Sequence, residues 1–174
     1  NGGTCDKSYI TVEYNSKFEL PVPSRLGYTF NGWYSGSSKV ENGTWTKTSS
    51  LDLKAKWSVT NYKITYNLDG ATNSLNNPSS YTFETSNIIL EDPSKTGYTF
   101  IGWTTNENKT PMLNVEIAKG SYGDKKFTAN FTPNKYKVTF DVNKGIDLEE
   151  SVLEYTYNNS YILPTPTKTG YKFD

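Results

Sequence analysis

A heptapeptide that returns at a nearly constant interval constrains the fold of this chain more than any other feature. Gly-Tyr-Thr-Phe-x-Gly-Trp occupies residues 27–33 and 97–103, and a related Gly-Tyr-Lys-Phe-Asp occupies 170–174. The starting glycines are 70 and 73 residues apart. Self-similarity at a fixed period indicates tandem units that are stabilised partly by their neighbours. We therefore interpret the chain as an array of small repeats rather than as one large domain.

Two further landmarks keep the same step and predict where the repeats begin and end. The segment 62–66 matches 136–140, and the segment 53–57 matches 127–131. A repeat therefore begins with a segment like 62–66 and ends with a segment like 127–131. The predicted divisions are a first repeat that lacks its opening strand (1–59), a complete second repeat (60–133) and a truncated third repeat (134–174).

The hydrophobic pattern alternates with the period of a β-strand in most segments. Tyr62, Ile64, Tyr66 and Leu68 alternate with polar residues, which is typical of a strand with one buried face. Helical candidates are short, near Asn114–Lys119 and with less support at Asp147–Val152. We expect a mainly β fold, α+β at most, built from small units of roughly 70–75 residues.

Composition excludes several classes of function. The chain has no histidine, which removes Ser-His-Asp catalysis and histidine-ligated metal sites, and its single cysteine, Cys5, excludes a disulfide within the chain. Eighteen basic residues balance eighteen acidic ones and Arg25 is the only arginine, so we expect no nucleic-acid partner. No apolar run approaches about 20 residues, so no membrane insertion is expected. The 15% aromatic content argues against disorder.

The repeated motif, with its preceding Pro-x-(Lys/Arg)-x and the terminal Leu-x-Ala-Lys-Trp at 53–57, resembles the Listeria–Bacteroides repeat, or internalin B-repeat, of bacterial cell-surface proteins. The resemblance covers essentially the whole chain. It implies tandem β-grasp-like units, similar to ubiquitin or SUMO, in secreted or wall-attached proteins, with no catalytic residues and no cofactor. The chain departs from the pattern at Asp69-Gly70-Ala71 and Asn143-Lys144-Gly145, and Phe131 stands where Trp57 does.

The motif residues are expected to be structural. The glycines that open the motif should hold turns, and the Tyr and Phe should share one strand face. The tryptophans fall on the other face unless the second glycine bulges the strand, and an exposed tryptophan would offer a platform for sugar stacking. The motif residues are Gly27, Tyr28, Phe30, Gly32 and Trp33 in the first copy, and Gly97, Tyr98, Phe100, Gly102 and Trp103 in the second.

Trp45 is the better candidate for a ligand contact, because the second repeat has no aromatic residue at the equivalent position. Partial burial in the core is the alternative role for this side chain. Cys5 is interpreted as an inert thiol, with an intermolecular disulfide as the alternative.

Acidic residues offer no convincing catalytic or metal site. The neighbours Glu91-Asp92 and Glu149-Glu150 could in principle do acid–base chemistry, but adjacent residues of a strand point to opposite faces. Asp141, Asp147 and Glu149 lack the spacing of a calcium-binding loop. We interpret all of these carboxylates as solvated surface.

These observations favour a non-catalytic, extracellular region of a secreted or wall-attached bacterial surface protein. It would act as a stalk or spacer and could serve as an adhesion module that contacts a host-surface protein or glycan. The alternative is a carbohydrate-binding accessory module of a larger extracellular glycosidase. A strand at Tyr136–Val142 could also complete the first repeat of another copy, which predicts head-to-tail self-association.

Overall fold

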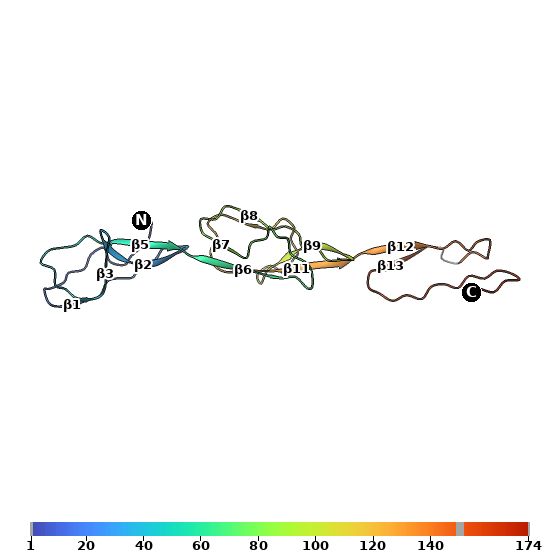
Figure 1. Ribbon diagram of the computed structural model, residues 1–174, viewed down its shortest axis with the longest axis horizontal. Coiled ribbons are helices and arrows are strands. Elements are labelled where there is room, and N and C mark those ends of the chain that lie inside the picture. Colours follow the sequence, from blue (N-terminus) through green and yellow to red (C-terminus); the bar gives the residue numbers. More distant parts are fainter. Residues whose placement is uncertain (1, 149–151, 174) are drawn as a thin grey trace. The chain divides into compact units, whose positions relative to one another are not determined.

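The computed structural model describes residues 2–148 and 152–173, and within this part of the chain it contains β-strands and no helix. Figure 1 shows these strands along the chain. The expectation of a mainly β fold is therefore confirmed, while the β-grasp-like arrangement remains a prediction. The strands are β1 (Lys17–Phe18), β2 (Tyr28–Ser35), β3 (Ser38–Val40), β4 (Gly43–Thr44), β5 (Lys54–Val59), β6 (Asn61–Asn67), β7 (Ser80–Thr82), β8 (Ile88–Ile89), β9 (Tyr98–Thr104), β10 (Glu116–Ile117), β11 (Lys125–Pro133), β12 (Lys135–Thr139) and β13 (Val152–Thr156).

The prediction of a helical turn at Asn114–Lys119 is wrong. This segment contains β10, which pairs antiparallel with β8, and Ile117 on β10 is buried. The amide side chain of Asn87 hydrogen-bonds the carboxylate of Glu116 and accepts from the backbone N–H of Lys119, which holds the segment extended. Of the second candidate, residues 149–151 lie outside the described residues and Val152 begins β13.

The strands form separate small sheets with a recurring order. The first repeat holds β3-β2-β5 and the second holds the four-stranded sheet β7-β6-β11-β9. In the third, β12 pairs with β13. The two-stranded ladders β1-β4 and β8-β10 complete the set among the described residues.

Contacts between Cα atoms divide the chain into two compact units that do not follow the repeats. The first comprises Asn1–Thr65, Pro78–Leu90 and Glu116–Lys125, and the second comprises Tyr66–Asn77, Glu91–Val115 and Lys126–Asp174. Both units therefore take part of the middle repeat, because that repeat packs against a neighbour on each side. The repeat boundaries at 59/60 and 133/134 remain a prediction from the sequence.

Each unit has its own buried apolar residues, which come from the alternating positions. Ile64, Tyr81, Leu90 and Ile117 form the buried core of the first unit. Trp103, Phe127 and Ala129 form that of the second. In β6 the burial alternates along the strand, with Ile64 fully buried between exposed Lys63 and Thr65, as the sequence pattern predicts.

Candidate functional site: the aromatic motif and the junctions between repeats

A tight turn precedes each copy of the motif. The backbone N–H of Tyr28 donates to the carbonyl of Arg25 at 3.1 Å, and Tyr98 donates to Lys95 at the same distance. The glycines in these turns have φ values of 78° and 77°, which match the third residue of a type II turn. Only glycine adopts this conformation without strain, so the sequence expectation for Gly27 and Gly97 fits the geometry.

The basic residue of each turn lies over the motif tyrosine. The guanidinium carbon of Arg25 is 3.5 Å from the ring centre of Tyr28, and the Nζ of Lys95 is 4.7 Å from that of Tyr98. Lys95 also forms a 2.7 Å ion pair with Asp69. These cation–π contacts fix the tyrosine rings from the turn side.

A bulge decides which face the motif tryptophans occupy. In the pairing of β2 with β5, Phe30 lies opposite Trp57 but Gly32 lies opposite Lys56, so one residue of β2 has no partner. The pairing of β11 with β9 shifts at the equivalent place. An extra residue reverses the alternation, and the indole then falls on the side of the phenylalanine. Of the two arrangements considered from the sequence, the structure therefore has the one in which the strand bulges near the second glycine of the motif.

The bulge brings the tryptophans into the interior. Ring centres are 5.6 Å apart between Phe30 and Trp33, and 5.3 Å apart between Phe100 and Trp103. Trp103 is fully buried, with 0% of its surface exposed. Trp33 is half-buried and donates its indole N–H to the carbonyl of Pro21 at 2.7 Å. Neither indole therefore forms an exposed platform.

An aromatic side chain from the following repeat covers each motif turn. The ring of Phe83 lies 6.1 Å from that of Tyr28, and the ring of Tyr157 lies 5.4 Å from that of Tyr98 in an edge-to-face arrangement. A Cβ atom on Gly27 would overlap the Phe83 side chain, and one on Gly97 would overlap the ring of Tyr157. The absence of a side chain on these glycines therefore admits the neighbouring repeat.

Each repeat continues into the next through one residue between two strands. Thr60 stands between β5 and β6, and its backbone N–H donates to the carbonyl of Gly27 at 2.9 Å. Asn134 stands between β11 and β12 and donates to Gly97 at the same distance. Their side chains hydrogen-bond motif threonines, at 2.9 Å to Thr29 and 2.7 Å to Thr99. The two junctions are thus equivalent.

The first junction carries an additional polar contact. The hydroxyl of Tyr28 donates to the carboxylate of Glu84 in the second repeat at 2.5 Å. This hydrogen bond, with burial as a smaller cause, raises the pKa of Tyr28 above its ordinary value. The hydroxyl is therefore a proton donor across the junction at physiological pH.

The covering role of Phe83 and Tyr157 was not predicted from the sequence. Each follows a tyrosine by two residues, Tyr81 in the second repeat and Tyr155 in the third, and each lies directly after the strand that holds that tyrosine, β7 or β13. The sequence signal for these residues is a second aromatic side chain two positions after the inward-facing tyrosine. Its partner could not be read from the sequence, because that partner lies in the preceding repeat.

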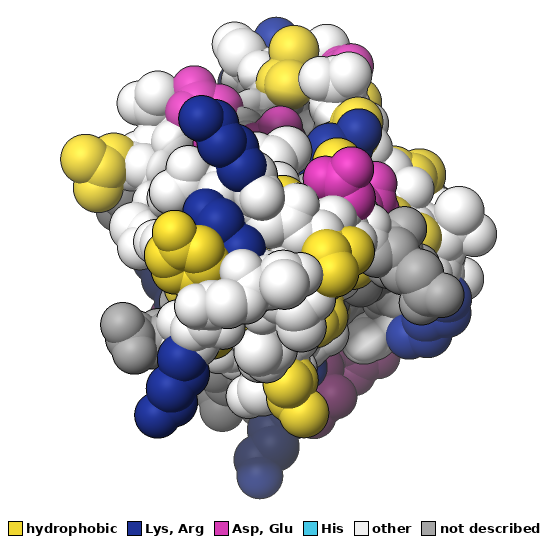
Figure 2. Space-filling model, turned by 90° about the vertical axis from the view of Figure 1, so that its right-hand side faces the viewer, with side chains coloured by type: hydrophobic (Ala, Val, Ile, Leu, Met, Phe, Trp, Pro, Cys, Tyr) yellow, Lys and Arg dark blue, Asp and Glu magenta, His cyan; other side chains and the backbone are white. Residues whose placement is uncertain are grey.

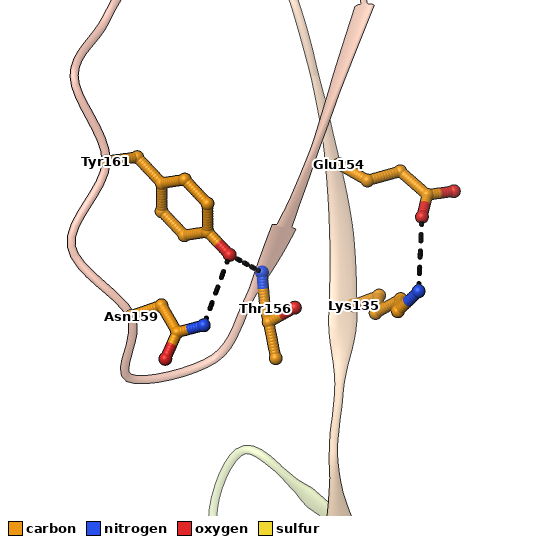
Figure 3. A network of polar contacts seen from close by, with 5 residues as sticks. All are labelled: Lys135, Glu154, Thr156, Asn159 and Tyr161. Atoms are coloured by element: carbon orange, nitrogen blue, oxygen red, sulfur yellow. Dashed lines mark hydrogen bonds and ion pairs between the residues drawn. The ribbon is translucent and has the colours of Figure 1, made fainter.

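The hairpin of the third repeat is held by a small polar network (Figure 3). The hydroxyl oxygen of Tyr161 accepts from the backbone N–H of Thr156 at 2.7 Å and lies 3.5 Å from the side-chain nitrogen of Asn159. These hydrogen bonds lower the pKa of Tyr161. Lys135 and Glu154 form an exposed ion pair at 3.6 Å across β12 and β13, which contributes little by itself.

Trp45 lies outside the junctions. Its half-buried indole packs edge-on against Phe18, with ring centres 5.5 Å apart, and its backbone pairs with Ser16 and Asn15. The residue as a whole is half-buried, and its role as a ligand contact stays a prediction. Cys5 is a half-buried free thiol.

The acidic residues do not gather into a site within residues 2–148 and 152–173, where no group of three metal-ligating side chains occurs. The carboxylate of Glu91 accepts from Ser74 and Asn76, and these hydrogen bonds lower its pKa. The pair Glu149-Glu150 lies outside the described residues, as does Glu149 of the calcium candidate. Figure 2 shows one face, where acidic, basic and hydrophobic side chains are interspersed rather than gathered by type.

The fold and junctions define a class of protein, a tandem all-β repeat whose units dock through an aromatic turn. Comparison with known families then identifies the chain. The Listeria-Bacteroides repeat domain matches residues 1–56, 62–130 and 136–174, so the chain belongs to this family. The resemblance inferred from the motif is confirmed. No solved structure matches the chain.

Three relatives cover most of the chain. A "Putative membrane protein" of Evansella cellulosilytica is 30% identical over 99% of the chain, and a "Putative Gly-rich membrane protein" of the same organism is 28% identical over 99%. Internalin H of Listeria monocytogenes is 29% identical over 72% of the chain. The chain spans only 26%, 20% and 23% of the lengths of these relatives.

These comparisons place the repeat in membrane proteins and an internalin, and none of the three descriptions names an enzyme. In the part of this chain that the structure describes, no helix is both long and apolar enough to cross a bilayer.

Proposed function

We propose that the chain is a non-catalytic spacer in a bacterial surface protein, located outside the cell in a secreted or wall-attached protein. The descriptions of the relatives, two membrane proteins and an internalin, support a surface location. The spacer would hold a functional part of the parent protein away from the cell. The chain covers about a quarter of each relative or less, so the activities of those whole proteins are not assigned to it.

The equivalence of the two junctions is the observation that carries this proposal. Phe83 packs on Gly27 and Tyr28, and Tyr157 packs on Gly97 and Tyr98, with one link residue in each case. A flexible linker would let successive repeats move freely. A single link residue pinned by hydrogen bonds to a turn that an aromatic ring covers restricts that motion, which suits a spacer.

Spin-label distances across the first junction would test the proposal. Nitroxides placed on Ser37→Cys and Ser86→Cys, both exposed, in a Cys5→Ser background would report on the first and second repeats. We expect a narrow distance distribution that broadens when Phe83→Ala is added. A broad distribution in the protein with Phe83 intact would contradict the spacer function. Leu75→Ala, at a fully exposed side chain, serves as the matched control and should leave the distribution narrow.

A secondary role in adhesion is proposed for the surface around Trp45, a half-buried tryptophan outside the junctions. The partner would be a host-surface protein or a glycan that stacks on the ring. A glycan and host-protein array should show saturable binding that Trp45→Ala abolishes and Trp45→Phe partly retains. Absence of binding by folded protein would leave the spacer function without an adhesive one. Because Trp33 and Trp103 pack inside their repeats, they do not favour the glycosidase-accessory alternative.

A further inference from the structure

Two tyrosine rings meet at the second junction, one from each of the repeats that it joins. Tyr98 is the tyrosine of the second motif, and Tyr157 directly follows β13 in the third repeat. Their ring centres are 5.4 Å apart and their planes are inclined by 75°, so an edge of one ring faces the other. The junction therefore holds two phenols from successive repeats in direct contact.

Two phenols in contact can undergo a reaction that phenylalanine cannot. A one-electron oxidant converts each phenol to a phenoxyl radical, and the proton of each hydroxyl passes to water. The two radicals couple through the ring carbons next to the carbon that bears the oxygen. The hydrogen atoms on the coupled carbons then move to the oxygens, which restores both hydroxyl groups. The product, dityrosine, has one new C–C bond, and the pair has given two electrons to the oxidant and two protons to water.

Two other tyrosine pairs among the described residues have a member that is shielded from solvent. Tyr62 and Tyr81 have ring centres 5.6 Å apart, but Tyr81 is only 3% exposed and its hydroxyl donates to the carbonyl of Gly123 at 2.6 Å. Tyr155 and Tyr161 have ring centres 4.4 Å apart, but the hydroxyl of Tyr155 is buried. Because both phenols must lose an electron and a proton, shielding of one member disfavours coupling in these pairs.

The pair at the second junction is more accessible. Tyr157 has 37% of its surface exposed, and Tyr98 is half-buried. Phe83, which holds the covering position in the second repeat, is also half-buried, so partial exposure is a property of the covering position. Lys95 lies over the ring of Tyr98, but its charge is paired with Asp69 at 2.7 Å. This pairing reduces the electrostatic cost of removing an electron from the ring.

We propose that Tyr98 and Tyr157 form an oxidative modification site, at which a one-electron oxidant joins the second and third repeats through a dityrosine bond. The bond fixes the covering ring to the turn that it covers, so the junction cannot open without breaking a covalent bond. The first junction stays unmodified, because Phe83 has no hydroxyl group. This modification depends on the contact between the two rings and is independent of the spacer function.

Peptide mass spectrometry on the unaltered 174-residue chain gives the first test. Dilute protein is treated with photogenerated tris(bipyridine)ruthenium(III), a small one-electron oxidant, and the monomer band of a denaturing gel is digested with trypsin. We expect residues 96–109 joined to residues 145–168, in a species lighter by two hydrogen atoms than the two peptides together. Oxidation of other tyrosines without this species would overturn the proposal, as would a link confined to bands larger than the monomer.

Two conservative variants assign the link to one tyrosine of the third repeat. Tyr157→Phe should abolish the linked species, because it removes the hydroxyl and leaves the phenylalanine found at the first junction. Tyr155→Phe is the matched control, since it removes a phenol from the same tryptic peptide and that hydroxyl has no hydrogen-bond partner. The control should form the link in unchanged yield. A link that survives Tyr157→Phe, or that Tyr155→Phe abolishes, would contradict the assignment.

Phe83→Tyr should create the same site at the first junction. The ring of Phe83 lies 6.1 Å from that of Tyr28, whose hydroxyl donates its proton to the carboxylate of Glu84. The added phenol should couple with Tyr28 and join residues 26–39 to residues 64–95. Near-UV circular dichroism before oxidation checks that the variant retains its packing. A folded variant that forms the link at the second junction but none at the first would contradict the proposal that the covering position directs the coupling.

Discussion

The side chain of Phe83 occupies the space that a Cβ atom on Gly27 would need. The adjacent residues Tyr28 and Glu84, which are 56 positions apart in the sequence, are hydrogen-bonded beside this contact. Tyr157 stands in the same relationship to Gly97. The opening glycine of the motif therefore has two roles: it permits the positive φ of the turn and leaves room for the next repeat. Substitutions can separate these roles.

Gly97→Ala should destabilise the protein more than Gly70→Ala. Both glycines have a φ of 77°, so both substitutions introduce the same backbone strain of roughly 1–2 kcal/mol. A Cβ on Gly70 would meet no atom within 4 Å, whereas a Cβ on Gly97 would overlap the ring of Tyr157. Gly97→Ala should therefore lose roughly 1–3 kcal/mol more free energy of unfolding than Gly70→Ala, and this difference measures the overpacking against Tyr157. Urea unfolding monitored by tryptophan fluorescence provides the measurement; equal losses for both variants would contradict the role of Tyr157.

Phe83→Ala should loosen the first junction. Truncating a buried phenylalanine costs about 3–5 kcal/mol, and a half-buried one such as Phe83 should cost less, roughly 1–3 kcal/mol. Native-state hydrogen exchange should show faster exchange at the amide of Thr60, whose bond to Gly27 closes the junction. Tyr9→Ala, at a strongly exposed ring, is the control for a lost aromatic and should have little effect. Unchanged exchange at Thr60 in the Phe83 variant would argue against the junction.

Asn130→Ala should lower the free energy of unfolding more than Asn31→Ala does, although both residues lie in the bulged strand pairs. The side-chain nitrogen of Asn130 donates to the carbonyls of Gly102 and Thr128 and to the hydroxyl of Thr104, at 3.0–3.1 Å. Asn130→Ala leaves these part-buried acceptors without their donor, at a cost of roughly 1–3 kcal/mol.

Asn31 supplies the matched control for that experiment. It is exposed and its side chain accepts one hydrogen bond, from Ser58 at 3.1 Å. Asn31→Ala should therefore change the free energy of unfolding by less than about 0.5 kcal/mol. Comparable losses for the two variants, measured by urea unfolding, would show that the network around Asn130 does not hold the bulge.

Stability should fall at alkaline pH through Tyr66. Burial raises the pKa of this phenol from 10.0 to about 12 in the folded protein. Below pH 10 the phenol is neutral in both states, so the contribution is fully present there. Between pH 10 and pH 12 the unfolded state releases its proton first, and stability declines, by roughly 1–2 kcal/mol once the partial exposure of the ring is considered.

The pH dependence of urea unfolding measures this effect. Tyr66→Phe should reduce the alkaline decline. Tyr161→Phe should leave it in place, because hydrogen bonds lower rather than raise the pKa of Tyr161. An identical decline in the Tyr66→Phe protein and the unaltered protein would contradict the assignment.

The strands that could be predicted from the sequence are those with long alternating patterns. β6, β9 and β11 each extend over seven residues or more and bury every second side chain over much of their length. β8 and β10 have two residues each, too few to establish a period, and their pairing depends on contacts between distant segments. The segment around β10 was therefore predicted as a helical turn.

The candidate site was partly accessible to sequence reasoning. The glycine turn followed from the Gly-Tyr step, and the bulge at Gly32 was one of two readings of the strand. Alternation alone could not choose between them, because the choice depends on how β2 pairs with β5. The contact of Phe83 with Gly27 was out of reach, since it joins positions in different repeats that share no local pattern.

The single residues that join the repeats determine how the chain would respond to tension. A pulling force on the polypeptide would enter the middle repeat through β6, directly after Thr60, and leave through β11, directly before Asn134. These first and last strands are hydrogen-bonded neighbours in the four-stranded sheet. The load would therefore fall on the ladder between them, and the segment from residue 68 to residue 124, which contains β7 to β10, would carry no load until that ladder broke. We expect such a repeat to act as a mechanical clamp that resists stretching until it yields in one step.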